Sequence, residues 1–290
     1  MNSAVLLMAH GTPSSLDEMP EYLRLVRGGR PPSAELVEEM RHNYGAIGGR
    51  SPLTEITLAQ ADALQQRLGE QVPVAVGMRN WKPFIKDALA ELAGRGIERV
   101  VGVPMAPQFS TLSVQKYVDA ANAVLPAGLR FEAVTSYHSH PLLLQAFAER
   151  VREAAVGEEL VIFTAHSLPK RVIEAGDVYA DEVAATARGV AALVGITRFE
   201  IAYQSAGRTP EPWIGPDLSE LITARVAAGT RSFLVVPVGF VCDHTEILFD
   251  IDVQAARTAA DAGAKLRRTE SLNTSPTFVS ALAEIVRARL

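Results

Sequence analysis

Two histidines stand at matching places in the two halves of the chain. His10 lies in the phrase AHGTP at residues 9–13, and His166 lies in AHSLP at residues 165–169, each directly after an apolar run. An imidazole at such a place can bind a metal ion or accept a proton near neutral pH. If the apolar runs are parallel strands, both rings lie at carboxyl ends, where open α/β sheets bind ligands. The repeat favours one shared cleft over the alternative, a core histidine bonded to the backbone.

An acidic segment follows a later apolar run in the second half. It has the sequence DHTEILFDID over residues 243–252. Glu246 and Asp250 are spaced i, i+4, so on a helix both carboxylates lie on one face, and Asp243 precedes Glu246 by one turn. Such a row can bind a cation or pass protons along. The alternative is a solvated helix whose first turn is acidic because acids complement the helix dipole.

The composition limits the chemistry that these side chains can serve. A formal net charge of -5 over 290 residues leaves no basic surplus for nucleic acid. The single cysteine, Cys242, excludes an internal disulfide, a Cys-rich zinc site and a cysteine-ligated iron–sulfur cluster within one chain. We therefore expect His and oxygen ligands for any metal, and no prosthetic group. No apolar run approaches the roughly 18 residues of a membrane span, and residues 1–9 lack a basic flank, so we expect a cytoplasmic protein.

The elements that must position these residues alternate along the chain. Short apolar runs lie at residues 4–9, 72–77, 99–103, 131–135, 160–164, 198–202 and 232–238. Helical patterns separate these runs, which predicts an α/β fold of βαβ units with parallel sheets. A second echo, VPMAPQF at 103–109 against VPVGFV at 236–241, predicts a duplicated architecture. We therefore expect an N-terminal domain over residues 1–135 and a C-terminal domain over residues 136–290, whose last helix packs back on the first.

The first half carries an insertion. The interval between His10 and Pro104 is longer than the matching interval between His166 and Pro237. The excess falls near residues 20–52, where Gly and Pro surround a predicted helix at 33–44. We expect this segment to form a wall of the cleft, and an ordinary surface connection is the alternative.

Five phrases of the sequence resemble the ferrochelatase family. They are AHGTP (9–13), YGAIGGRSPL (44–53), APQFS (106–110), AHSLP (165–169) and GFVCDHTE (239–246). They extend over nearly the whole chain, and the resemblance is closest to the short bacterial form, which uses coproporphyrin III. The resemblance implies two Rossmann-like domains of the class II chelatase type with a porphyrin cleft between them. It also implies that Fe²⁺ is a substrate and that iron-coproporphyrin III is released to haem biosynthesis.

The resemblance assigns roles to residues of the acidic segment. It implies that His166 and Glu246 bind the iron and accept the pyrrole protons. Asp250 and Gln254 would continue a path for protons or metal. Because Gln254 is not an acid, we expect Asp252 or water to complete that path.

The resemblance also implies contacts with the porphyrin. The residues at the matching positions are His10, Arg27, Asn43, Tyr44, Ser51 and Tyr117. His10 replaces a tyrosine that ligates iron from the opposite face in short bacterial enzymes, so we expect it to contact the metal too. Asn43 replaces a basic residue. Arg27, with Arg30 near it, offers guanidinium groups that suit the propionates.

Three alternatives stand beside a coproporphyrin III ferrochelatase. They are a protoporphyrin IX ferrochelatase, a sirohydrochlorin-type cobalt or iron chelatase, and a porphyrin or haem carrier without turnover. The AHGTP phrase permits the second, because sirohydrochlorin cobaltochelatases also place a histidine at that strand end. The acidic row argues against the third, because a carrier does not need it. As partners we expect coproporphyrin III, Fe²⁺ and a transient contact with the downstream haem enzyme, for a chain that acts as a monomer.

Overall fold

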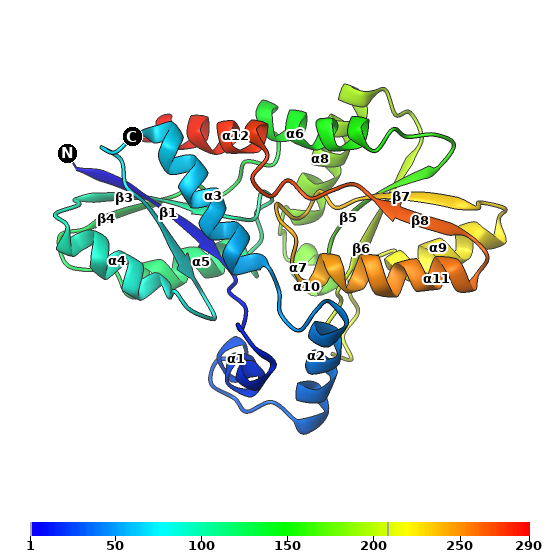
Figure 1. The fold of residues 1–290 in the computed structure, drawn as a ribbon, viewed down its shortest axis with the longest axis horizontal. Helices are drawn as coiled ribbons and strands as arrows, with labels where there is room; N and C mark the ends of the chain where they lie inside the picture. The colour runs from blue at the N-terminus through cyan, green and yellow to red at the C-terminus, as the bar shows by residue number, and fades with distance from the viewer. Residues whose placement is uncertain (1, 208) are drawn as a thin grey trace.

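Two parallel sheets of four strands, one in each half of the chain, form the framework of the computed structural model (Figure 1). The structure describes residues 2–207 and 209–290. The first sheet has the order β2-β1-β3-β4 and the second has the order β6-β5-β7-β8. The strands are β1 (Ser3–Ala9), β2 (Val74–Met78), β3 (Arg99–Pro104), β4 (Arg130–Ala133), β5 (Leu160–His166), β6 (Phe199–Gln204), β7 (Ser232–Val236) and β8 (Lys265–Arg268). The predicted duplicated α/β architecture is confirmed.

Helices cover both faces of each sheet. They are α1 (Met19–Val26), α2 (Ala34–Ala46), α3 (Leu53–Leu68), α4 (Ile85–Gly94), α5 (Val114–Asn122), α6 (Pro141–Glu153), α7 (Lys170–Glu174), α8 (Tyr179–Val194), α9 (Leu218–Ala227), α10 (Thr245–Leu248), α11 (Ala256–Asp261) and α12 (Pro276–Arg287), with a 3₁₀ turn η1 (Leu16–Glu18) and a π-helix η2 (Asp250–Ala255). In β1, Leu7 belongs to the cluster with α3 and α12, whereas Leu6 and Met8 pack with α4 and α5. Burial on both faces explains why this strand is a continuous apolar run.

The two central strands hold equivalent places. β1 pairs with β2 and β3, and β5 pairs with β6 and β7, all in parallel. His10 directly follows β1, and His166 is the last residue of β5. The repeated phrase therefore marks the carboxyl end of the central strand in each sheet.

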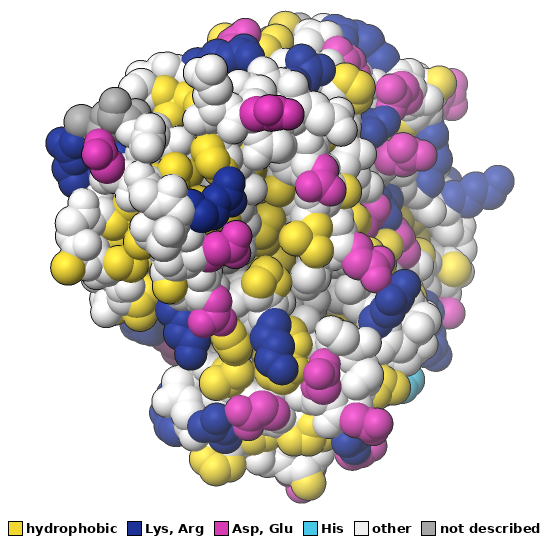
Figure 2. Space-filling view, turned by 60° about the vertical axis from the view of Figure 1, so that its left-hand side comes forward, with side chains coloured by type: hydrophobic (Ala, Val, Ile, Leu, Met, Phe, Trp, Pro, Cys, Tyr) yellow, Lys and Arg dark blue, Asp and Glu magenta, His cyan; other side chains and the backbone are white. Residues whose placement is uncertain are grey.

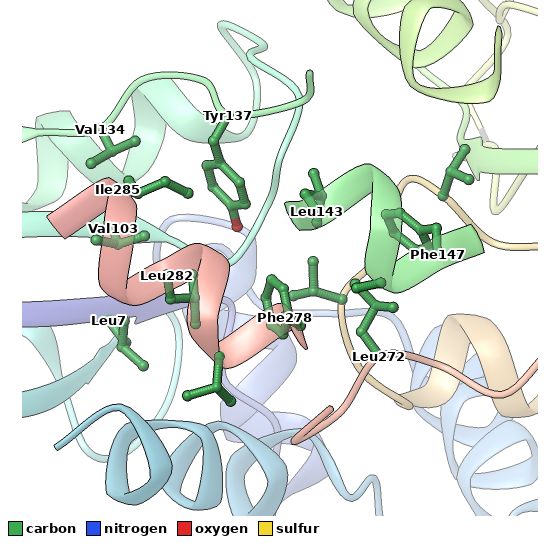
Figure 3. Close-up of a cluster of buried hydrophobic side chains, with 14 of the residues drawn as sticks. Leu7, Val103, Val134, Tyr137, Leu143, Phe147, Leu272, Phe278, Leu282 and Ile285 are labelled. Carbon is green, nitrogen blue, oxygen red and sulfur yellow. The ribbon is translucent and has the colours of Figure 1, made fainter. Parts of the chain in front are cut away.

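The last helix, α12, packs over the first sheet beside α3 and also contacts α6 of the second half (Figure 3). Phe278 and Leu282 of this helix share one buried cluster with Leu7 and Val103 of the first sheet and with Phe147 of α6. The helix contacts both α3 and α6. Because one continuous core joins the halves, the two strand ends are held in a fixed relation to each other.

The insertion forms a helical pair, α1 and α2, that stands below the sheets in Figure 1. The helix predicted at 33–44 is α2, and the Ser33 hydroxyl caps it by accepting a hydrogen bond from the amide of Leu36. The pair has its own small core of Met19, Tyr22, Leu23, Val37, Tyr44 and Trp81. Trp81 follows β2, so it anchors the pair to the first sheet.

The surface carries charges of both signs. On the face drawn in Figure 2, Lys and Arg side chains are interspersed with Asp and Glu. That face offers no broad basic field for a phosphate backbone. Among the described residues, the helices are all too short or too polar to cross a membrane.

Candidate functional site

A cavity of about 1240 Å³ opens where the carboxyl ends of both sheets meet the helical pair α1 and α2. His10 and Arg79 enter it from the ends of β1 and β2, and Met105 enters it from the end of β3. From the second sheet, His166 and Gln204 enter it at the ends of β5 and β6. The two halves therefore build one cavity, and both histidines of the repeat line it.

Glu246 lies between two histidines on the wall formed by the second half. Its Oε1 is 3.7 Å from Nε2 of His166, and its Oε2 is 3.6 Å from Nε2 of His244. The side chains of His166 and Glu246 are 32% and 39% exposed, whereas that of His244 is 15% exposed. His166 and Glu246 thus present an imidazole and a carboxylate to the cavity, a pair that can bind a divalent cation.

Backbone carbonyls orient both imidazoles. Nδ1 of His166 contacts the carbonyl of Ser167, and Nδ1 of His244 lies 3.0 Å from the carbonyl of Cys242. Nε2–H of His244 donates to Glu246, whereas in the neutral His166 ring Nδ1–H donates to the Ser167 carbonyl and Nε2 keeps its lone pair. This is the tautomer that binds a metal through Nε2.

The charges in this cluster decide the ionisation of Glu246. Burial acts to raise its pKa, but His166, His244 and His10 outweigh burial and lower the pKa to about 2. Burial acts to lower the pKa of His244, whereas Glu246 raises it, and the net shift is upward. Glu246 is therefore a carboxylate at neutral pH, suited to neutralise a bound cation rather than to store a proton.

Asp250 and Gln254 extend the wall away from Glu246. Both line the cavity and lie in η2, where the chain leaves α-helical spacing for a π-helix, a rare element that is frequent at functional sites. The Ser205 hydroxyl donates a hydrogen bond to the Asp250 carboxylate. Burial raises the pKa of Asp250 to about 6, Glu246 adds to the rise and Ser205 opposes it. A carboxyl with this pKa can take up and release protons near neutral pH.

Asp243 and Asp252 do not belong to this row, so that part of the prediction is wrong. Neither lines the cavity, and both contact the guanidinium of Arg268 instead. Helical spacing does not apply to Asp243, because α10 begins only at Thr245. Asp252 lies in the π-helix and forms its ion pair at the end of β8, so it cannot complete a path from Asp250 along the cavity wall.

His10 faces the cavity from the first half. Its Nδ1 lies 3.1 Å from the carbonyl of Gly11 and 3.2 Å from the hydroxyl of Tyr22 on α1. Burial and, after it, the charge of Arg79 lower the pKa of His10 to about 4. The ring is therefore neutral at neutral pH, the form that can ligate a metal.

Arg79 and Tyr22 are among the wall residues that the sequence analysis did not name. Arg79, in the turn after β2, lies with its guanidinium 5.6 Å from the ring centroid of Tyr117. Tyr22 belongs to the insertion and contacts both His10 and the ring of Trp81. No spacing along the chain marks either residue, because each meets its partner only through the tertiary fold.

The structure brings most of the predicted porphyrin contacts to the cavity. The wall includes His10, Arg27, Asn43, Tyr44 and Tyr117. Ser51 is not on the wall, because it is buried at the start of α3, where its hydroxyl accepts a hydrogen bond from the amide of Leu53. Arg30 is exposed outside the cavity, and its Nε donates to the carbonyl of Arg27.

The second half also fixes the wall loop that follows β3. Glu182 accepts a hydrogen bond of 2.6 Å from the amide of Phe109, and Asp177 accepts one of 2.7 Å from the amide of Thr111. Hydrogen bonds from backbone amides to carboxylates are among the stronger ones in proteins. Hydrogen bonds from the second half, which carries His166, therefore hold residues 105–113 in position on the cavity wall.

Gly239 allows the end of β7 to approach the end of β5. A Cβ at this position would lie 2.6 Å from Cβ of Ala165 and 2.7 Å from its Cα, next to His166. Because neither backbone can move freely, we expect Gly239→Ala to lower the free energy of unfolding by about 1–3 kcal/mol in chemical denaturation. Gly94→Ala is the control, since its Cβ would meet no atom within 4 Å. Equal stabilities of Gly239→Ala and the unaltered chain would contradict this prediction.

The family model and the curated relatives identify one family. The family model described as ferrochelatase matches residues 2–290. The chain is 42% identical over 300 residues to a ferrochelatase of Deinococcus radiodurans, covering 98% of this chain and 95% of that protein. It is 37% identical over 301 residues to the coproporphyrin III ferrochelatase of Bacillus subtilis, covering 99% and 97%. Among solved structures it is similar in fold to SirB from Bacillus subtilis with Fe³⁺, with a TM-score of 0.61, 11% identity, and coverage of 99% and 95%. The predicted chelatase-like fold is confirmed.

Proposed function

The chain belongs to the ferrochelatase family, a family of metal chelatases of haem biosynthesis, and we propose that its reaction is the insertion of Fe²⁺ into coproporphyrin III. The observation that carries the proposal is the placement of ionised Glu246 between His166 and His244 in a cavity that neutral His10 also enters. This cavity has room for a porphyrin-sized ligand, with metal-binding groups from both halves.

The chemistry exchanges two pyrrole N–H protons for one Fe²⁺ ion. His166 and Glu246 bind the iron, and the carboxylate charge of Glu246 offsets part of the cation's charge. As the iron passes to the four porphyrin nitrogens, the freed imidazole of His166 accepts the first pyrrole proton, hands it to Asp250, and then accepts the second. Asp250 receives protons from this region, and Gln254 orients water beyond it. His10 contacts the metal of the product from the first half.

The insertion supplies the groups that suit the porphyrin's carboxylates. Coproporphyrin III carries four propionates, whereas protoporphyrin IX carries two propionates and two vinyl groups. Arg27 offers a guanidinium for a bidentate contact, and Asn43 and Tyr44 offer hydrogen bonds. Tyr117, on α5 outside the insertion, offers one more. The name of the Bacillus subtilis relative supports coproporphyrin III, while the Deinococcus radiodurans relative is named only as a ferrochelatase.

A comparison of substrates tests the proposal. We expect kcat/KM with Fe²⁺ to be about tenfold or more higher for coproporphyrin III than for protoporphyrin IX. The reason is that charge-assisted hydrogen bonds to two further propionates contribute about 1.5–3 kcal/mol each, and about 1.4 kcal/mol is a factor of ten. The measurement is the loss of free-porphyrin fluorescence under anaerobic conditions at matched porphyrin concentrations.

Two controls make this comparison decisive. Insertion of Zn²⁺ into the same porphyrins separates porphyrin choice from metal choice. Sirohydrochlorin with Co²⁺ tests the cobaltochelatase alternative, and tight binding of every porphyrin without turnover would identify a carrier. A clear preference for protoporphyrin IX would refute the substrate proposal.

Within the proposal the chain holds no prosthetic group and acts as a cytoplasmic monomer that hands its product to a downstream haem enzyme.

A further inference from the structure

Arg268 joins the two ends of the segment that carries Glu246 and Asp250. It is the last residue of β8, and its side chain is 13% exposed. Nε lies 2.7 Å from Oδ1 of Asp252, and Nη2 lies 3.0 Å from Oδ2 of the same carboxylate. Nη2 is also 3.0 Å from Oδ1 of Asp243. One guanidinium thus holds a carboxylate before the segment's first helical turn and another inside its π-helix.

Asp243 is held from a second side as well. The Ser271 hydroxyl donates to its Oδ1 at 2.7 Å, and the Asn273 side-chain amide donates to its Oδ2 at 3.0 Å. The amide of Asp243 in turn donates to the side-chain oxygen of Asn273 at 2.9 Å. These contacts leave Asp243 little freedom, so it is a firm attachment point for the segment that follows.

The segment between these attachment points depends on tertiary contacts for its shape. α10 has four residues and η2 has six before it continues directly into the six-residue α11, and helices this short are not stable without tertiary contacts. Glu246 and Asp250 line the cavity, whereas Asp243 and Asp252 do not and contact β8. Ile247 and Ile251 bury the apolar side of the segment in the core of the second half. The contacts of Arg268 with Asp243 and Asp252 fix a further side, and together they leave Glu246 and Asp250 facing the cavity.

We propose that Arg268 is a positioning residue for metal insertion, which fixes the orientation of Glu246 and Asp250 without touching either substrate. An arginine is required because its planar fork can serve two carboxylates in fixed directions. A lysine would keep the charge but offers a single mobile ammonium. This inference rests on the proposed function where it is tested by the rate of metal insertion. Its test by hydrogen exchange does not depend on that function.

The rate assay compares Arg268→Lys with Arg267→Lys, the same substitution at the preceding residue of β8. Arg267 contacts Glu159 and the carbonyl of Ala154 instead of the acidic segment. We expect Arg268→Lys to lower kcat by about 10–100-fold, the usual effect of removing a residue that orients metal ligands. The KM for porphyrin stays close to that of the unaltered chain, because Arg268 is outside the porphyrin wall. Arg267→Lys keeps kcat, and equal kcat values for the two variants would overturn the inference.

A double-mutant cycle separates positioning from general loss of stability. In an Asp250→Asn background the carboxylate that Arg268 orients is already altered, so Arg268→Lys should lower kcat by a smaller factor than in the unaltered chain. Equal factors in both backgrounds would mean that Asp250 carries none of the effect of the arginine, and would overturn the inference for that carboxylate. Asp252→Asn, which weakens the bidentate contact but keeps Arg268, should reproduce the loss of kcat.

Hydrogen exchange tests the same inference without turnover. We expect amides of residues 243–255 to exchange faster in Arg268→Lys than in Arg267→Lys, while those of β5 remain unchanged. Unchanged exchange at residues 243–255 would overturn the inference. If the unaltered chain inserted no metal into any porphyrin, the proposed function would fail, and this exchange comparison would still decide whether Arg268 holds the segment.

Discussion

Replacing His166 by alanine abolishes iron insertion while porphyrin binding survives. This outcome is expected because His166 presents its Nε2 to the cavity 3.7 Å from Glu246, and the variant removes both a metal ligand and a proton acceptor. Loss of one positioned proton acceptor alone costs about 10²–10⁴ in rate, so we expect kcat to fall at least 100-fold. The porphyrin contacts lie on other elements, so the Kd for coproporphyrin III, measured by fluorescence quenching, should stay close to that of the unaltered chain.

His140→Ala is the matched control for this experiment. His140 precedes α6, lies 3.7 Å from Glu284 on α12, and does not line the cavity. Its removal should leave kcat unchanged. Undiminished insertion by His166→Ala would refute the mechanism, and loss of porphyrin binding by the same variant would show that His166 holds the macrocycle instead.

Much of the fold can be predicted from the sequence, because the burial of each central strand is visible in the residues of that strand alone. The central strands β1 and β5 are buried on both faces, so each is a continuous apolar run that ends at a polar turn. A histidine at that turn can be placed without knowing any tertiary contact. The structure accordingly brings His10 and His166, predicted from the repeat, to one cavity.

The sequence could not predict which carboxylates of the acidic segment face the cavity and which face β8. Helical spacing placed Asp243, Glu246 and Asp250 in one row, but the chain enters a helix only at Thr245. The π-helix then changes the register, and Arg268 draws Asp252 toward β8. No local sequence pattern predicts the ion pair of Arg268 with Asp252, because its two partners lie on different elements.

The two histidines of the repeat also differ in a way that spacing does not reveal. His10 is kept neutral by burial and by Arg79, and its hydrogen-bond partner comes from the insertion. His166 lies beside the ionised Glu246, with His244 behind it. Equivalent strand ends thus offer different chemistry, because only the second half places a carboxylate next to its imidazole.

That carboxylate is the second residue whose loss should be severe. Glu246→Gln preserves the size of the side chain but removes the negative charge that faces His166 and His244. The amide cannot offset the charge of Fe²⁺, so we expect kcat to fall by at least about 100-fold. The KM for Fe²⁺ should rise, whereas the KM for porphyrin should stay nearly constant. Initial rates over a matrix of Fe²⁺ and porphyrin concentrations measure all three constants.

The control for Glu246→Gln is the same substitution at Glu174, an exposed residue at the end of α7 that does not line this cavity. Glu174→Gln removes the same charge from the chain and should leave all three constants unchanged. If Glu174→Gln lowered kcat as much as Glu246→Gln, the net charge of the protein and not the position of Glu246 would explain the effect. A kcat for Glu246→Gln within a few-fold of the unaltered chain would mean that the histidines alone hold and deliver the iron, since the carboxylate between them would then be dispensable.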